Sequence, residues 1–138
     1  SKCKPKYHAA ASIVSNQVVA LFAEAQAMLM ECGFQTETAM DALKKIFLGN
    51  AKHVAQVGPV KALTGPVQRG DVSTVAKHLS MLEKPKDRLL YLLLSERLME
   101  VAKKGKADYQ EKAMRDLLDN SYSQLLAEEY SRLKGDRN

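Results

Sequence analysis

The chain has 138 residues, of which 46% are hydrophobic, 27% charged and 6% aromatic, and its formal net charge is +5. This length suits one globular domain with a core, and no run of about 18 uncharged apolar residues is present, so we expect no membrane partner. Acidic and basic residues are interspersed and aromatics are few, which argues against nucleic acid as a partner. With two cysteines, Cys3 and Cys32, we expect a reduced, cytoplasmic protein.

The first predicted element is a long helix over about residues 7–32, ended by Gly33. Its centre, residues 18–23, is apolar on every side, which predicts burial on most faces. His8, Ser12 and Asn16 follow one another at four-residue spacing, so they share a polar face near the helix start. We weigh two interpretations of this stripe evenly: it lines a substrate cleft, or it faces solvent.

A second helix is expected to start at Thr36, whose side chain suits an N-cap. Its apolar face is interrupted at Gly49-Asn50, which predicts a kink or a break. Asn50 is then either a helix-break residue that bonds backbone groups, the interpretation we favour, or a residue of a cleft. Gly58-Pro59 ends the segment.

Residues 62–71 form a loop that two glycines and a proline, Pro66, punctuate within a few residues. Thr64, Gly65 and Arg69 offer donors to an anionic ligand. The simpler interpretation, which we favour, pairs Arg69 with Asp71 to brace the loop, while Asp71 caps the next helix. Thr64 and Gly65 remain the candidates to face a ligand.

Three further helices are predicted over about residues 72–82, 85–104 and 107–133. Residues 89–94 again indicate burial on nearly all sides. No alternating β pattern occurs, so we predict an all-α fold of five or six helices, with residues 135–138 as a tail. Two helices that are apolar nearly all round exceed the interior positions of so small a domain, which favours a homodimer. No cysteine or histidine has metal-ligand spacing, so we expect no metal.

Three stretches together resemble one family: residues 7–16, the segment from Asn50 to Pro59, and residues 62–71 followed by Thr74-Val75 and His78-Leu79. It is the C-terminal helical domain, catalogued as a domain of unknown function, of oxidoreductases with an N-terminal Rossmann-like domain. It is similar in fold to the C-terminal domains of 6-phosphogluconate dehydrogenase-like and pyrroline-5-carboxylate reductase-like enzymes. The resemblance spans about residues 7–82 through its motifs, of which the loop is the more specific.

The resemblance implies a dimerisation and substrate-cleft domain at residues 7–134, with residues 1–6 as the remnant of a joint to the Rossmann domain. NAD(P) would bind that domain, because this chain contains no Gly-x-Gly-x-x-Gly turn and no βαβ unit. The fragment alone would bind no cofactor and would be inactive. It would form a homodimer, either intertwined or packed face to face. Its partners would be a small-molecule substrate and its own Rossmann domain.

The same resemblance implies a substrate-binding role for Asn16. Some of the dehydrogenase relatives carry a lysine one helical turn before that asparagine, where this chain has Ser12. His8, two turns before Asn16, is the candidate acid/base in its place, because histidine is a common general acid and base. Ser12, Asn50, Thr64 and Gly65 are the other substrate-binding candidates. The alternative function is a non-catalytic all-α protein-interaction module.

Overall fold

The computed structural model describes residues 2–135, and in this part of the chain the secondary structure is helical with no strand. The predicted all-α class is confirmed. The chain divides into two compact units, Ser1–Lys52 and His53–Asn138. The sequence predicted one helical domain over residues 7–134 and did not predict the division after Lys52. Each unit is described by itself.

The first unit opens with one continuous helix made of α1 (Cys3–Ser12), a π-helical segment η1 (Ile13–Gln17) and α2 (Val18–Glu31). The backbone stays right-handed helical at both junctions. The helix begins about four residues earlier than predicted, so two of the lysines assigned to a joint lie within it. Its end is as predicted: Gly33 has a φ of +94°, which favours glycine.

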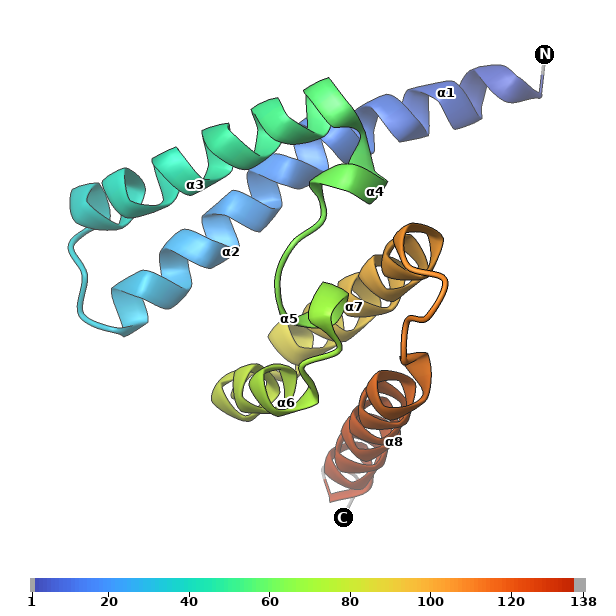
Figure 1. The fold of residues 1–138 in the computed structure, drawn as a ribbon. Helices are drawn as coiled ribbons and strands as arrows, with labels where there is room; N and C mark the ends of the chain where they lie inside the picture. The colour runs from blue at the N-terminus through green and yellow to red at the C-terminus, as the bar shows by residue number, and fades with distance from the viewer. Residues whose placement is uncertain (1, 136–138) are drawn as a thin grey trace. The chain divides into compact units, whose positions relative to one another are not determined.

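Helix α3 (Thr36–Val57) returns antiparallel to α2, and the two form a hairpin (Figure 1). The rings of Phe22 and Phe47 meet edge to face with centroids 5.4 Å apart. Near the turn, Gln26 Nε2 donates to the carbonyl oxygen of Thr36 at 3.2 Å. Aromatic packing in the middle and a hydrogen bond at one end fix how the two helices pair.

Two expectations about α3 were wrong. Thr36 is the first helical residue and not the cap, and its hydroxyl lies 3.8 Å from Met30 Sδ. The predicted kink or break at Gly49-Asn50 is absent, because α3 runs through both residues. A glycine inside a helix costs about 1 kcal/mol relative to alanine, which is too little to end a helix of this length between good helix formers.

The predicted burial of the first helix was also wrong. None of the residues of α1, η1 and α2 is buried, and Ala39 is the buried residue of α3. Val14 is 75% exposed and Val19 68%. A two-helix hairpin covers each helix on one side only, so the all-round apolar segment keeps an uncovered face.

The second unit contains α4 (Pro59–Ala62), α5 (Pro66–Arg69), α6 (Val72–Met81), α7 (Pro85–Gly105) and α8 (Glu111–Gly135). Gly58 and Gly65 have φ values of +81° and +101°, and each precedes a proline that starts a short helix. The short Gly-Pro-Val echo in the sequence is therefore the same local structure formed twice.

Helices α6, α7 and α8 supply most of the core of this unit. Its buried residues are Val67, Val75, Leu79, Leu92, Met99, Met114, Leu118 and Leu125. Helix α7 is not buried all round as predicted, because Leu90, Leu93 and Leu94 remain 36–47% exposed. Helix α8 starts at Glu111, four residues later than expected. Of the predicted tail, Gly135 ends α8, and residues 136–138 lie outside the described part.

Candidate functional site

The polar stripe at the start of the chain lies on α1 and η1. His8 is exposed and its ring meets that of Tyr7 edge to face at 5.9 Å, while Ser12 is half-buried and Asn16 is exposed. Asn16 belongs to the π-helical segment. A π turn closes over five residues instead of four, so Asn16 is displaced around the helix relative to the His8–Ser12 line.

A serine side chain in the π-helical segment bonds to the backbone of the preceding turn. The Ser15 hydroxyl donates to the carbonyl oxygen of Ala11 at 2.6 Å. Single π turns inside α-helices are rare and often occur at functional sites. The structure places such a turn at Asn16, which the sequence singled out by its spacing alone.

The hairpin brings Asn16 and Asn50 to the same end of the first unit. From the Phe22–Phe47 contact, Asn16 lies six residues back along one helix and Asn50 three residues forward along its antiparallel neighbour. At about 1.5 Å per residue, the two asparagines differ by only about 4.5 Å in height along the hairpin. Two amide side chains therefore lie at comparable heights, and each can both donate and accept.

A groove of about 630 Å³ opens on the same hairpin. Most of its lining is apolar and includes Val14, Val18, Val19, Phe22, Phe47 and Leu48. Its polar lining residues are Ser15, Gln26 and Lys44. The first two already donate to carbonyl oxygens, of Ala11 and Thr36, so the Lys44 ammonium and the rest of the Gln26 amide are the polar groups that face an occupant.

The loop residues lie in the second unit, and the structure gives Asp71 the capping role that the sequence favoured. Asp71 Oδ1 accepts from the backbone N–H of Thr74 at 3.1 Å, and Asp71 Oδ2 accepts from the Thr74 hydroxyl at 2.7 Å. The Thr74 bonds, with smaller contributions from Ser73 and Arg69, lower the pKa of Asp71. Arg69 Nη2 lies 4.0 Å from Asp71 Oδ2, a loose and exposed ion pair. The cap, more than the ion pair, fixes this end of the loop.

The remaining loop residues form backbone structure. Gly65 and Pro66 start α5, and Gly70, with a φ of +69°, ends it. Thr64 is exposed and Gly65 half-buried. Helix α5 has only four residues, too short to build up the macrodipole that binds anions. The geometry therefore supports a loop that orients α6, with Thr64 as its accessible hydroxyl.

One contact to this loop had no signal in the sequence. The Tyr109 hydroxyl donates to the carbonyl oxygen of Val67 at 2.6 Å. Tyr109 lies in the connection between α7 and α8, and burial, with a smaller effect of Glu111, raises the pKa of its hydroxyl. A single tyrosine in the short connection of residues 106–110 gives no pattern from which this partner could be inferred.

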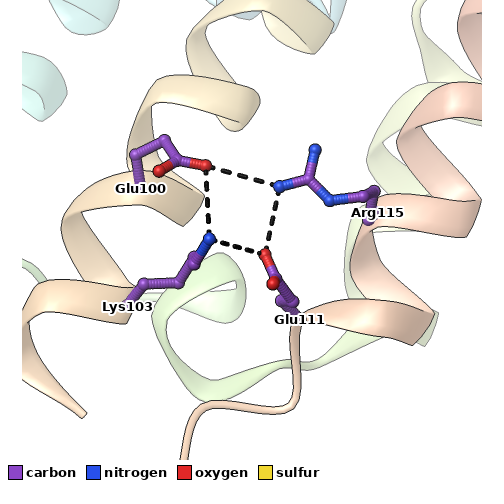
Figure 2. A network of polar contacts seen from close by, with 4 residues as sticks. All are labelled: Glu100, Lys103, Glu111 and Arg115. Atoms are coloured by element: carbon purple, nitrogen blue, oxygen red, sulfur yellow. Dashed lines mark hydrogen bonds and ion pairs between the residues drawn. The ribbon is translucent and has the colours of Figure 1, made fainter. Parts of the chain in front are cut away.

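A second feature without a sequence signal joins α7 to α8. Lys103 Nζ lies 3.0 Å from Glu111 and 3.8 Å from Glu100, and Arg115 Nη2 lies 3.0 Å from Glu111 and 3.4 Å from Glu100 (Figure 2). The four charges alternate in sign around a closed ring. Bonds from Lys103 and then Arg115 lower the pKa of Glu111. The ring holds the start of α8 against the end of α7.

His78 and Tyr91 form a third polar contact, between α6 and α7. His78 Nδ1 lies 2.7 Å from the Tyr91 hydroxyl, and the two rings meet edge to face. Burial raises the pKa of Tyr91. In the sequence His78 has no metal-ligand spacing, and the structure gives it a tyrosine partner.

Metal ions and membranes are the two partners that the sequence did not favour. Among residues 2–135, no three His, Cys, Asp or Glu side chains gather as they would to hold a metal ion. The helix from Cys3 to Glu31 is long and apolar enough to cross a membrane by length and composition alone, and none of it is buried. A signal sequence near the N-terminus and the mostly buried core helix of a soluble protein meet the same criterion.

These features define an all-α helical domain in which an uncovered apolar hairpin precedes a glycine- and proline-punctuated loop and a three-helix core. The family model described as Domain of unknown function (DUF2520) matches residues 1–98. The chain belongs to this family. The resemblance likewise implied a helical domain of unknown function. Neither a curated protein nor a solved structure matches the chain.

Proposed function

We propose that this chain is the C-terminal dimerisation and substrate-cleft domain of an NAD(P)-dependent oxidoreductase. The observation that carries the proposal is the first unit, where an extensive uncovered apolar surface lies beside Asn16 and Asn50. An apolar surface of this kind serves assembly, and a polar end beside it serves recognition of a small molecule. The motif resemblance connects both features to oxidoreductases.

The exposed apolar surface supports the dimerisation role. Large hydrophobic side chains are exposed along the whole hairpin: Tyr7, Ile13, Val14, Val19, Leu21, Met30, Phe34, Met40, Ile46, Phe47 and Leu48. At roughly 100 Å² each, they present on the order of 1,000 Å² to solvent. A monomer's largest apolar patch is typically about 300–600 Å², and a standard interface takes about 800 Å² from each partner.

The polar end supports the substrate role. Asn16 and Asn50 bring amide donors and acceptors, and Ser12 adds a hydroxyl on the preceding turn. His8, one further turn away, supplies an imidazole, a side chain that can serve as general acid or base. In this proposal the asparagines and Ser12 bind and orient the substrate, and His8 moves the proton. Thr64 and Gly65, in the second unit, are separate candidates for contact with a substrate.

The residues present do not fit the dinucleotide itself. Residues 2–135 contain no strand, so the glycine-rich turn between a strand and a helix that holds the pyrophosphate has no counterpart in this part of the chain. The two glycines that precede helices, Gly58 and Gly65, start helices of four residues. We therefore assign the cofactor to a Rossmann domain elsewhere in the parent protein and derive no step through it.

The test compares this chain with the product of the full reading frame. Titrations of NADPH and NADH, followed by nucleotide fluorescence, are expected to saturate with the full-length protein and to show no binding by residues 1–138. In the full-length protein, Asn16→Ala is expected to leave nucleotide binding unchanged, because Asn16 is assigned to the substrate. A full-length protein that binds neither nucleotide would refute the oxidoreductase role and favour the non-catalytic interaction module.

A further inference from the structure

We infer that the groove between α2 and α3 is covered by the same face of a second copy of this chain, and that this pairing encloses the Asn16 end of the hairpin. The inference rests on the dimerisation role proposed above and specifies the surface that performs it. Three properties of the groove select a second copy as the occupant: its chemistry, its rim and its charge.

The chemistry of the groove excludes a small molecule as the main occupant. Ligand sites combine an apolar lining with several polar groups that fix the ligand's orientation. In this groove the Ser15 hydroxyl and one N–H of Gln26 donate to backbone carbonyl oxygens, which leaves the Lys44 ammonium and the rest of the Gln26 amide as its polar groups. A groove of 630 Å³ with so few polar groups suits apolar side chains of another protein surface.

The rim of the groove is itself apolar and uncovered. Val14, Val19 and Leu48 line the groove, yet they are 75%, 68% and 58% exposed. Side chains that line a groove and still protrude into solvent can enter an identical groove on a second copy. A two-fold interface uses the same patch on both partners. That patch must therefore contain both a groove and protruding side chains that can enter the groove of the other copy.

The charge distribution favours self-association. No Asp, Glu, Lys or Arg occurs from Tyr7 to Ala23, so two copies of this segment meet without like-charge repulsion, and Lys44 of α3 is the charged residue among those that line the groove. The groove reaches Val14 and Ser15, which directly precede Asn16. A copy that covers the groove therefore forms a wall next to Asn16, and the candidate substrate end depends on assembly.

The first experiment is sedimentation of the wild-type chain, of Val19→Asp and of Ile46→Asp. Ile46 is the matched control, because it is 71% exposed on α3 but does not line the groove. We expect a wild-type dimer at tens of micromolar, a dissociation constant raised at least tenfold by Val19→Asp, and a change below twofold for Ile46→Asp. Leu48→Asp, on the opposite helix, repeats the test if Val19→Asp lowers the helix content measured by circular dichroism.

The outcomes separate the inference from the proposed function. A wild-type dimer that survives both groove variants, or that Ile46→Asp disrupts instead, overturns the groove as the interface and leaves dimerisation intact. A wild-type monomer overturns both the inference and the dimerisation role, and the nucleotide titration tests the oxidoreductase role separately. Flotation of a monomer with phosphatidylcholine–phosphatidylglycerol vesicles would identify a lipid surface as the occupant in place of a second copy.

The second experiment tests the enclosed end directly. Amide hydrogen exchange of η1 (Ile13–Gln17) is expected to slow at least fivefold as the wild-type concentration rises through the dissociation constant. Helix α6 in the second unit is the internal reference, and its exchange is expected to stay constant. Exchange of η1 that is independent of concentration in a proven dimer would overturn the dependence of the Asn16 end on assembly.

Discussion

Tyr109 and Val67 are joined by a hydrogen bond of 2.6 Å from the tyrosine hydroxyl to the valine carbonyl oxygen, across 42 residues of sequence. Val67 lies in α5, inside the loop that gives this family its most specific motif, and its side chain is 4% exposed. The family model ends at residue 98. The loop is therefore held in place from a part of the chain beyond the matched region.

Tyr109→Phe is expected to destabilise the second unit by about 1 kcal/mol, because the carbonyl oxygen of Val67 loses one of its two partners in a partly buried place and keeps the backbone N–H of Gly70 at 3.1 Å. Urea unfolding followed by circular dichroism measures the change. Tyr130→Phe is the matched control, because Tyr130 is 62% exposed. A Tyr109→Phe midpoint as close to the wild type as that of the control would show that the bond contributes nothing to stability.

Asp71→Ala is expected to lower the urea midpoint, whereas Asp71→Asn preserves most of the stability at pH 7. Asparagine accepts the bond from the Thr74 backbone as aspartate does, and alanine cannot. Stability that falls equally in both variants would assign the contribution to the charge of Asp71 instead of the cap. Ser73→Ala, which removes a longer bond of 3.2 Å to the same carboxylate, is expected to have the smaller effect.

Glu111 makes the stability of the α7–α8 contact depend on pH. Its pKa is lowered from the ordinary value of 4.5 by Lys103 and Arg115. A carboxyl group with a lowered folded pKa stabilises the fold above about pH 4.5, and this contribution is lost as pH falls through the folded value. The difference in urea midpoint between the wild type and Glu111→Gln is therefore expected to be largest near pH 7 and to shrink toward pH 3.

The control for this pH dependence is Asp119→Asn on the same helix. Asp119 is exposed, and the ion pairs of the ring do not include it, so its midpoint difference from the wild type is expected to be small and nearly constant with pH. Added salt is expected to reduce the Glu111→Gln effect, because exposed ion pairs are screened. A Glu111→Gln difference that grows below pH 4 would contradict an origin in the ion pairs of Glu111.

The predictable parts of this fold were those set by local chemistry. Gly33, Asp71 and Pro85 stop or start helices through their own backbone and side-chain properties, and all three do so in the structure. Gly49-Asn50 misled because the cost of one glycine is small against a long helix. The π-helical segment at Asn16 carried no signal, since its residues suit an α-helix equally well.

Burial was the less predictable part, because it depends on how many layers cover a helix. The apolar centre of the first helix indicated a core position, but in the hairpin α3 covers one side of it. Residues such as Val14 and Val19 show by their exposure that apolarity on every side can indicate an interface as well as a core. The candidate site was likewise predictable only in part. The four-residue spacing in the sequence indicated Asn16, whereas the position of Asn16 along the hairpin relative to Asn50 follows from the structure.

Helix α8 is expected to be essential to the second unit although the family model stops before it. Met114, Leu118 and Leu125 are at most 4% exposed and pack with Val75 and Leu79 from the matched region. Leu118→Ala is expected to cost about 2–5 kcal/mol, the range for opening a cavity in a packed core. Leu126→Ala, at a position 54% exposed, is expected to stay within about 0.5 kcal/mol of the wild type.

A chain that stops after Leu98 extends the same argument. It lacks Met99, Met114, Leu118 and Leu125 and therefore loses half of the buried cluster, which leaves Val75 and Leu92 open to water. We expect it to show helical circular dichroism without a cooperative urea transition, because an open apolar surface does not specify one packing. A cooperative transition in residues 1–98 would show that the matched region folds independently and that α8 only covers it.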